Sequence, residues 1–553
     1  MAANFDNAES GNRKLWIDVA ILLVLCWALF FSLLGDRPLW DIDEGMHAHT
    51  SKVMVQTGDW VTPTMNGENF YDKPPLFNWL VAMAFMVFGF TEFAARLPAA
   101  LLGTACVIAT YVLGRKLFDR MTGLLGGVIL ATSLEFLVMS RVVVHDIALA
   151  LTVTLSLLFF WFAFEDEDRR NQYLFWFYVS CGFAVLAKGP LGLVLVGLVV
   201  GPWLLLRRRL SFVREMGLWW GAIVFLAVAA PWYVLIMRAN ADFGAYFFIQ
   251  QNFMNFVSAE SRHPEPWYYY FAIVVGGFFP WTAFLPMAVG HGLRIRHEDD
   301  RGRLLYLGLW CGMMLLFFSS ASSKLPSYIL PMFPALALLV AVAWRDLLVR
   351  PTQRLRNLAL GSLAVLAGIL VVAFVYYGTR ELESAMAKYN VDAAVFMTTI
   401  AVLVMGVVLA TALCWRRFYR SCFATIAGAV VLFILAVNSM VVPPLNEYRS
   451  TKELGRRIDL VIPAGEPIVF YRDLRDSTLF YTDRLGHILR DTGQFVEHMA
   501  QDRPAHCVVK RQHLENFDHG LLEDLFVVDG DDGKVVLSNR PPEEWGGTSN
   551  VQR

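Results

Sequence analysis

Apolar runs of 16 to 23 residues recur along most of the chain and are separated by short polar segments. A run of this length can cross the hydrocarbon core of a bilayer as an α-helix, and together the runs predict about thirteen spans. They fall at 15–34, 97–114, 121–139, 147–164, 172–187, 190–206, 216–237, 267–289, 303–320, 328–344, 358–377, 394–414 and 421–442. The pattern therefore predicts an all-α polytopic membrane protein.

The apolar segment Phe77–Phe90 is short for a span, and it follows Pro74 and Pro75. If this segment lies on the outer surface as an interfacial helix, the basic residues of the loops gather on one side of the membrane. They are Arg13, Lys14, Arg115, Lys116, Arg120, Arg169, Arg170, Arg207, Arg208, Arg209, Arg294, Arg296, Arg350, Arg354, Arg416, Arg417 and Arg420. That side is predicted to be cytoplasmic, since basic loops stay inside, and the loop 39–76 is then external.

The composition changes after about Pro443. Apolar runs shorten to strand length, as in PIVFY and HCVVK, and the segment LFVVDGDDGKVVLSN has a turn between two β-branched runs, which is typical of a hairpin. We therefore expect two domains. Residues 1–442 form the membrane domain, whose external loop 36–96 carries interfacial helices, and residues 443–553 form a small external α/β domain.

Composition excludes several classes of protein. The chain is 56% hydrophobic and 17% charged, with a mean hydropathy of +0.48, which is far above the value of a soluble domain. The net charge of −1 gives no basic field for a nucleic acid. Seven cysteines occur without a CxxC pair, so we expect neither a disulfide nor a thiolate metal site.

Candidate chemistry begins directly after the first span, in the polar stretch Leu39–Leu76. It carries Asp41, Asp43 and Glu44, which could simply belong to a solvated loop that caps the next helix. Other ionisable side chains recur on the same predicted side, at the ends of separate helices. They are Asp72, Lys73, Arg141, Asp146, Lys188, Arg262, His263 and Lys324. Their convergence predicts a site at the outer rim of the helical bundle.

Each of these residues also has a simpler interpretation. Lys188 and Lys324 could be cations that only favour helix carbonyl ends, and Arg141 with Asp146 could be a local ion pair. His47 and His49 would point apart on a helix, so a metal site between them is not expected. None of these residues alone names a reaction.

Several motifs occur in a characteristic order. They are LWDIDEGMHAHTSKVMVQTGDWVTP, NFYDKPPL, EFAARLP, RVVVHD, LAKGP, APWY, PWYYY and SSKLPSYILP. Over the whole membrane part, the chain resembles the protein O-mannosyltransferase superfamily of polyprenyl-phosphate-dependent glycosyltransferases, and most closely the bacterial lipid A 4-amino-4-deoxy-L-arabinose transferases. One segment departs from that family, because Asn252-Phe-Met-Asn255-Phe stands where the arabinose transferases have an H-x-x-R-F pattern.

The resemblance implies the GT-C glycosyltransferase fold and an inverting transfer of 4-amino-4-deoxy-L-arabinose from undecaprenyl phosphate to a lipid A phosphate. The reaction would take place on the periplasmic face of the bacterial inner membrane. With the charge placement, it assigns residues to four roles. The expected catalytic residues are Asp43, Asp146 and Glu44; the expected donor phosphate ligands are Lys73, Arg262, Tyr328 and Lys324; the expected substrate contacts are Tyr71, Asp72 and Asp41; and His263 is a candidate metal ligand.

The same interpretation requires no cofactor, although a divalent metal ion is compatible with the Asp41-x-Asp43 pattern. The expected partners are the undecaprenyl-phosphate-linked sugar, lipid A or another periplasmic glycolipid, and membrane lipids, with no nucleic acid, and the protein is expected to be a monomer. Other functions stay open at this point: a protein O-mannosyltransferase, transfer of another sugar to another glycolipid, a transporter, or a non-catalytic assembly protein. A transporter should show inverted repeats and charges at the membrane midplane, and neither is visible.

Overall fold

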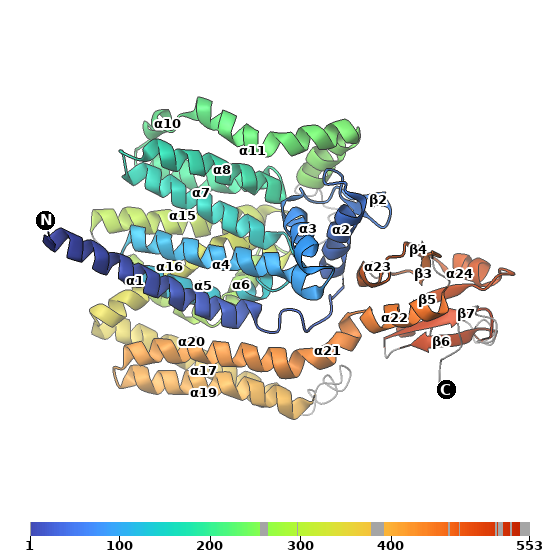
Figure 1. Cartoon of the computed structure of the whole chain (residues 1–553). Coiled ribbons are helices and arrows are strands. Elements are labelled where there is room, and N and C mark those ends of the chain that lie inside the picture. The colour runs from blue at the N-terminus through green and yellow to red at the C-terminus, as the bar shows by residue number, and fades with distance from the viewer. Residues whose placement is uncertain are drawn as a thin grey trace.

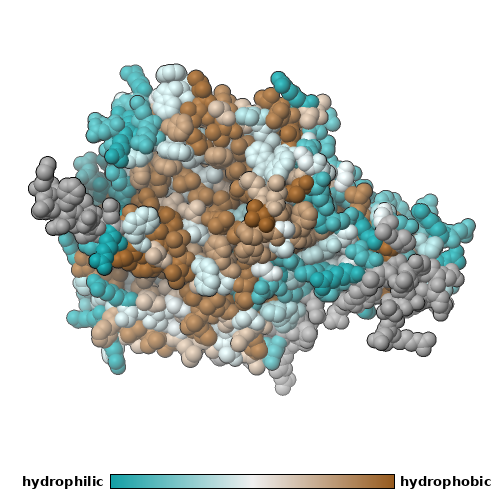
Figure 2. Space-filling model, viewed as in Figure 1, coloured by the Kyte–Doolittle hydropathy of each residue, from teal (hydrophilic) through white to brown (hydrophobic). Residues whose placement is uncertain are grey.

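Long helices run roughly side by side in the computed structural model, and a small domain containing strands lies at one end of them (Figure 1). The structure describes residues 2–541 except 42, 255–263, 296, 378–391, 463–464, 475, 515–516, 518–521, 523 and 531–532. The hydrophobic surface forms a band over the middle of the bundle, and hydrophilic residues gather at its two ends (Figure 2). This distribution is the one expected for a bundle surrounded by lipid.

The helical elements follow one another along almost the whole membrane part. In order they are α1 (Ala2–Cys26), η1 (Trp27–Phe31), α2 (Asp43–Thr57), α3 (Leu76–Phe88), α4 (Glu92–Leu117), α5 (Arg120–Ala131), α6 (Leu134–Met139), α7 (Asp146–Glu165), α8 (Arg170–Lys188), α9 (Leu191–Leu206), α10 (Phe212–Glu215), α11 (Leu218–Ala239), η2 (Ala245–Met254), α13 (Tyr269–Gly277), η3 (Trp281–Phe284), α14 (Leu285–Gly292), α15 (Glu298–Ser320), η4 (Pro326–Met332), α16 (Phe333–Val349), α17 (Gln353–Tyr377), α19 (Ala393–Trp415), α20 (Tyr419–Ala436), η5 (Val437–Val441) and α21 (Val442–Arg449).

Within the described residues, nine helices are long and apolar enough to cross a membrane, or up to ten if the bent pair Tyr269–Gly277 and Trp281–Gly292 is one span. Shorter apolar helices occur at α3, α5 and α9. Each predicted span falls on helical elements of the structure, but the span 121–139 is divided between α5 and α6, and the span 267–289 is broken by a 106° bend after α13. The polytopic helical architecture is thus confirmed.

The helix α7 and the span Pro326–Val349 lie at the centre of the bundle. Of their apolar segments, 78% and 83% are buried inside the protein. The buried share for Ala393–Trp415 is 22%, so this helix is peripheral.

Side chains at both ends of the well-buried helix α4 stabilise it. The Thr91 side chain caps its first turn by accepting a hydrogen bond from the Ala94 amide, while Arg115 and Lys116 lie in its last turn.

Helices α2 and α3 lie across the end of the bundle that faces the small domain (Figure 1). The helix α3 has 13 residues and packs against α2 and α4. The helix is short for a membrane span, and the prediction that Phe77–Phe90 is an interfacial helix stays a prediction. Between α2 and α3 the chain forms a two-stranded hairpin, β1 (Thr64–Met65) and β2 (Glu68–Asn69).

The C-terminal part forms a five-stranded sheet in the order β4-β3-β5-β7-β6. Its elements are α22 (Lys452–Val461), β3 (Ile468–Tyr471), α23 (Asp476–Thr482), β4 (Gly486–Leu489), α24 (Thr492–Met499), β5 (His506–Lys510), α25 (Arg511–Leu514), β6 (Phe526–Gly530) and β7 (Lys534–Ser538). β3 pairs in parallel with β4 and β5, while β7 pairs antiparallel with β5 and β6. The predicted hairpin around DGDDG is therefore β6–β7. The domain boundary at 442/443 stays a prediction.

The small domain contacts the membrane domain through α23, which packs against α2. The Ser477 amide donates a 2.7 Å hydrogen bond to Asp41 Oδ1, and Lys52 Nζ donates a 2.7 Å bond to the carbonyl oxygen of Phe480. Lys52 also forms a 2.6 Å ion pair with Asp483. The helix that begins with the candidate catalytic acids is thus held from outside the membrane by the C-terminal domain.

The contact between α2 and α23 depends on Gly45. A Cβ atom at this position would lie 2.4 Å from the Ser477 amide nitrogen and 2.8 Å from its Cα, and neither backbone atom can move alone. We expect Gly45→Ala to destabilise the docked domain by about 1 to 3 kcal/mol, the usual cost of overpacking. Its apparent unfolding temperature in detergent should fall, and protease should cleave the C-terminal domain faster.

Gly197→Ala is the matched control for Gly45→Ala. Gly197 also lies within a helix, but no atom lies within 4 Å of the position that its Cβ would take. The same change there should be neutral or slightly stabilising, since alanine has the higher helix propensity. Equal behaviour of the two variants would contradict the close packing of α2 on α23.

Candidate active site

A pocket of about 290 Å³ opens at the end of the bundle where α2 and α3 lie. Its lining joins charged side chains to an apolar wall. The lining residues are Asp72, Lys73, Pro74, Lys188, Pro190, Leu191, Val194, Phe247, Gln251, Phe317, Phe318, Ala321, Ser323 and Tyr328. Segments far apart in the sequence thus build one site, as the convergence of ionisable residues predicted.

Lys73 lies in the loop before α3, where it forms a 2.8 Å ion pair with Asp72. The side chain of Gln251 donates a hydrogen bond to the other Asp72 carboxylate oxygen. Burial opposes the charge of Lys73, but the Asp72 carboxylate and Tyr328 outweigh it, so the pKa of Lys73 is raised. Lys73 therefore presents a permanent positive charge to the pocket.

A second cation reaches the pocket from the end of α8. Lys188 forms a buried ion pair with Asp146, the first residue of α7. Its Nζ lies 4.0 Å from the centre of the Tyr328 ring, which is a cation–π distance. The interpretation of Lys188 as a helix-end cation alone is thus insufficient, because its charge lies within the site.

The alternative of a local ion pair between Arg141 and Asp146 is wrong. The Arg141 guanidinium donates to the carbonyl oxygens of Leu29, at 2.6 Å, and of Ser32, at 2.7 Å. It therefore closes the last turn of the first span, since the final carbonyls of a helix lack partners within it. The ion pair of Asp146 is instead formed with Lys188.

Asp43 begins α2, and its side chain is exposed. Partial desolvation at the rim, together with the neighbouring carboxylates of Asp146 and Asp72, raises the pKa of Asp43, and the charge of Lys73 opposes this. Asp43 therefore shares the electrostatic environment of the pocket residues while staying open to solvent. This combination suits a carboxylate that meets an incoming substrate.

Glu44 has a different environment from Asp43, although the two are adjacent. Its carboxylate is buried and accepts paired hydrogen bonds from Arg96, with Nε–Oε1 at 2.8 Å and Nη2–Oε2 at 2.9 Å. Arg37 adds a 3.0 Å bond to the same carboxylate. Burial alone would raise the pKa of Glu44, but Arg96 and Arg37 outweigh this effect and lower it.

These contacts favour a structural role for Glu44, and its assignment as a catalytic residue stays a prediction. Both of its oxygens are engaged, and the bound Arg96 guanidinium also donates to the carbonyl oxygens of Leu34, Arg37 and Pro38. The pair fixes the turn between the first span and α2. Sequence reasoning missed the role of Arg96, which appeared only within the motif EFAARLP.

Three further candidates lie outside the pocket lining. Lys324 Nζ donates to the carbonyl oxygens of Glu265, at 2.8 Å, and of Ala321, so the structure does not support a phosphate ligand there. Asp41 accepts the hydrogen bond from α23 described above. Tyr71 packs against Phe243, with ring centres 5.4 Å apart, and its hydroxyl accepts a bond from Asn69. The predicted substrate contacts of Asp41 and Tyr71 stay predictions.

Arg262 and His263 lie outside the described residues, as does Asn255 of the departing segment. Within the part of the chain that the structure describes, no group of three or more His, Cys, Asp or Glu is placed to hold a metal ion. The metal prediction at His263 thus stays a prediction. His47 and His49 do face different neighbours: the His47 ring lies 4.4 Å from that of His145, while His49 bonds to the backbone of Leu479.

The raised pKa of Asp43 predicts a distinct pH dependence. If the ionised carboxylate is required, activity falls as the pH drops through a pKa above the ordinary 3.8. Asp72→Asn removes a negative charge that raises the pKa of Asp43. It also leaves Lys73 without its ion-pair partner, and the positive charge of Lys73 lowers the pKa of Asp43. The acidic limb of the pH profile should therefore move to lower pH. Normalised profiles of transfer rate against pH measure the shift.

The control for the pH shift is Glu68→Gln, which removes an exposed acid from the hairpin between α2 and α3, an acid that is not among the groups shifting the pKa of Asp43. Its acidic limb should match that of the unmodified protein. If Asp72→Asn moved the limb to higher pH, or left it in place, the electrostatic coupling between Asp72 and Asp43 would be disproved.

Known proteins resemble the chain at several levels. Residues 72–235 match the family model of the dolichyl-phosphate-mannose-protein mannosyltransferases. An undecaprenyl phosphate-α-4-amino-4-deoxy-L-arabinose arabinosyl transferase of Erwinia tasmaniensis is 31% identical over 429 residues, which are 74% of this chain and 76% of the relative. A protein of the same description from Pseudomonas fluorescens is 30% identical over 478 residues, which are 84% and 85% of the two chains.

Solved structures share the fold. ArnT from Cupriavidus metallidurans bound to undecaprenyl phosphate superposes with a TM-score of 0.80 at 24% identity, covering 95% of this chain and 98% of that one. An oligosaccharyltransferase of Archaeoglobus fulgidus superposes with a TM-score of 0.51 at 13% identity, over 90% of this chain and 70% of that one. These matches confirm a GT-C membrane fold with a small C-terminal domain containing strands.

Proposed function

We propose, since this chain belongs to the family of undecaprenyl phosphate-α-4-amino-4-deoxy-L-arabinose arabinosyl transferases, that it transfers this amino sugar from undecaprenyl phosphate to a phosphate group of lipid A. The relatives carry the donor in their names, and the solved ArnT holds undecaprenyl phosphate. The lipid A acceptor is part of the proposal. So is the location of the reaction, on the periplasmic face of the bacterial inner membrane.

One observation carries the proposal: Lys73 and Lys188 line the same pocket as the apolar side chains of Leu191, Val194, Phe247, Phe317 and Phe318. A prenyl phosphate has the complementary chemistry, with an anionic head and a hydrocarbon tail. Charge-assisted hydrogen bonds from lysine ammonium groups hold such a phosphate, and the apolar wall accepts the first isoprene units. Tyr328 borders both parts and completes the donor site.

The chemistry needs little from a general acid, because a phosphate leaves as an anion. The bond between the sugar and the donor phosphate breaks while the acceptor oxygen attacks the opposite face of the sugar, which inverts the configuration. Asp43 is exposed and is electrostatically coupled to Asp72 and Lys73 of the pocket, and in this scheme the acceptor approaches from its side. An ionised acceptor phosphate needs no base, so Asp43 would position the acceptor or hold the ammonium group of the sugar.

Asp146 takes part through Lys188 in this scheme. Its carboxylate holds the Lys188 ammonium in place beneath Tyr328, and it is a positioning residue for the donor phosphate. The scheme requires no metal ion.

The orientation is also part of the proposal. Nucleotide sugars are confined to the cytoplasm, so an external site needs a donor carried across the membrane by a lipid. The basic loops gather at the opposite end of the bundle from the site, as the positive-inside rule requires for an external active site. We expect the chain to act as a monomer.

Purified protein tests the proposal directly. Undecaprenyl phosphate-4-amino-4-deoxy-L-arabinose and lipid A, mixed with the full chain in detergent, should yield lipid A heavier by one aminopentose, also in the presence of EDTA. A peptide rich in serine and threonine serves as the competing acceptor. Modification of the peptide instead would favour protein O-glycosylation, and no product with either acceptor would contradict transfer to lipid A.

A further inference from the structure

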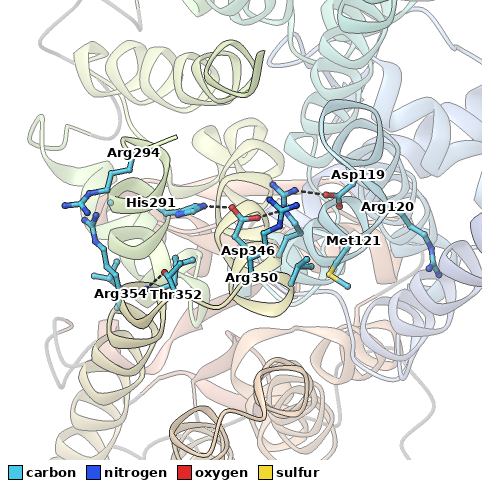
Figure 3. Close-up of a pocket in the computed structure, with 14 residues that line it drawn as sticks. Asp119, Arg120, Met121, His291, Arg294, Asp346, Arg350, Thr352 and Arg354 are labelled. Carbon is cyan, nitrogen blue, oxygen red and sulfur yellow. Dashed lines mark hydrogen bonds and ion pairs between the residues drawn. The ribbon is translucent and has the colours of Figure 1, made fainter. Parts of the chain in front are cut away.

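A second pocket, of about 830 Å³, lies at the other end of the bundle. It is formed where α5 begins, where α14 and α16 end and where α17 begins (Figure 3). The span Pro326–Val349 has Tyr328 of the active site near its first residue and Arg350 directly after its last. The two pockets therefore lie at opposite membrane faces, and they share no lining residue.

The lining of this pocket is strongly basic. It contains Arg120, Arg294, Arg345, Arg350 and Arg354 against the two acids Asp119 and Asp346. Both acids are engaged by Arg345, whose guanidinium lies 2.9 Å from Asp119 Oδ2 and 2.8 Å from Asp346 Oδ1. Both carboxylates of the pocket are thus held in ion pairs with Arg345. His291 adds a 2.6 Å contact with Asp346.

Arg120 forms a 2.7 Å ion pair with Asp18 of the first span, so three guanidinium groups of the pocket remain. Arg294, Arg350 and Arg354 are exposed, and within the part of the chain that the structure describes none has a carboxylate partner. Figure 3 shows the side chains of Arg294 and Arg354 extending toward one another on one side of the pocket. Like charges gathered in this way repel, and a bound anion relieves the repulsion.

The same pocket has an apolar part. Met121, Val349, Leu355 and Leu358 line it, and the Val349 side chain is 55% exposed at the end of a membrane span. A small soluble anion would satisfy the arginines and leave this wall uncovered. A lipid would satisfy both, because its phosphate and its acyl chains are adjacent.

We propose that this pocket binds the phosphate headgroup of an anionic phospholipid from the leaflet opposite the active site. Arg294, Arg350 and Arg354 hold the phosphate oxygens, and the first carbons of the acyl chains lie on Val349 and Leu358. Basic pockets between membrane helices bind lipid headgroups through this chemistry. The inference is independent of the proposed reaction, since no residue of the active site contributes to this pocket.

Native mass spectrometry of the full chain in neutral detergent tests the inference. The probes are phosphatidylglycerol, phosphatidylcholine and inorganic phosphate at matched concentrations. We expect phosphatidylglycerol to be retained in preference to phosphatidylcholine. The variant R294Q/R350Q/R354Q should bind it about 100-fold more weakly, since each arginine near a lipid phosphate contributes roughly a fivefold factor and the three factors multiply.

The control variant R208Q/R209Q/R214Q removes three exposed arginines from the same end of the bundle, outside the pocket. It should bind phosphatidylglycerol within about twofold of the unmodified protein. Arg354→Gln alone changes one exposed side chain and should weaken binding by about fivefold, which keeps the test decisive if the triple variant does not fold.

Equal loss of binding in the pocket and control variants would overturn the site and leave only general attraction to basic loops. Inorganic phosphate that displaced phosphatidylglycerol at equal concentration would overturn the lipid and favour a soluble phosphate. Retention of both phospholipids to the same extent would overturn the role of charge.

Discussion

Asp43→Asn is expected to lower the rate of aminopentose transfer by at least about 1000-fold, while the protein folds normally. A correctly placed carboxylate that orients an acceptor or stabilises charge in the transition state contributes an effect of this order. The asparagine keeps the shape of the side chain and removes its charge at the rim of the donor pocket. Initial rates with purified protein, at saturating donor and acceptor, measure the effect.

The fold should tolerate Asp43→Asn because the Asp43 side chain is exposed. Its apparent unfolding temperature should match that of the unmodified protein. Glu68→Gln, in the hairpin between α2 and α3, is the control for loss of one negative charge and should keep full activity. Near-normal transfer by Asp43→Asn would remove Asp43 from the centre of the mechanism.

Arg96→Leu should give the largest loss of stability among single changes near the site, about 3 to 5 kcal/mol. The substitution leaves the Glu44 carboxylate buried with only Arg37 as a cation, and it releases the three carbonyl groups that Arg96 binds. The turn before α2 would then lose its anchor. The apparent unfolding temperature of the detergent-solubilised chain should fall sharply, and activity should fall with it.

The double variant E44L/R96L separates two contributions to the loss of stability: the unpaired buried charge of Glu44 and the lost contacts of Arg96. It removes both partners, so it should be more stable than R96L alone, as expected when the cost lies in an uncompensated buried charge. The exposed pair of Arg456 and Glu453 supplies a control, because Arg456→Leu should cost at most about 1 kcal/mol. A double variant less stable than R96L would contradict this account of Glu44.

The helical membrane architecture could be predicted from the sequence because it depends on the number and length of the apolar runs. Spans are set by the thickness of the bilayer, so their lengths can be counted. The short segment Phe77–Phe90 was separated from them by its length and by the distribution of basic loops, and the structure has α3 at the bundle end. The β6–β7 hairpin was visible because turn residues separate two β-branched runs.

The ion pairs could not be predicted from the sequence in the same way. Glu44 and Arg96 are 52 positions apart, and Asp146 and Lys188 are 42 apart, so helix packing decides which groups meet. Arg141 is near Asp146 in sequence, yet its side chain reaches the end of the first span instead. The sequence therefore indicated which rim carries the site without separating the pocket residues from the structural ones, as Glu44 and Lys324 illustrate.

The central claim is that this chain modifies lipid A through a site that depends on Asp43. Mass spectrometry of lipid A tests it most directly, in a bacterial strain that lacks its own arabinose transferase and expresses either this chain or its Asp43→Ala variant. We predict an added mass of one aminopentose with the unmodified chain and none with the variant, at equal protein levels. Unchanged lipid A in both strains, with folded protein in the membrane, would contradict the claim.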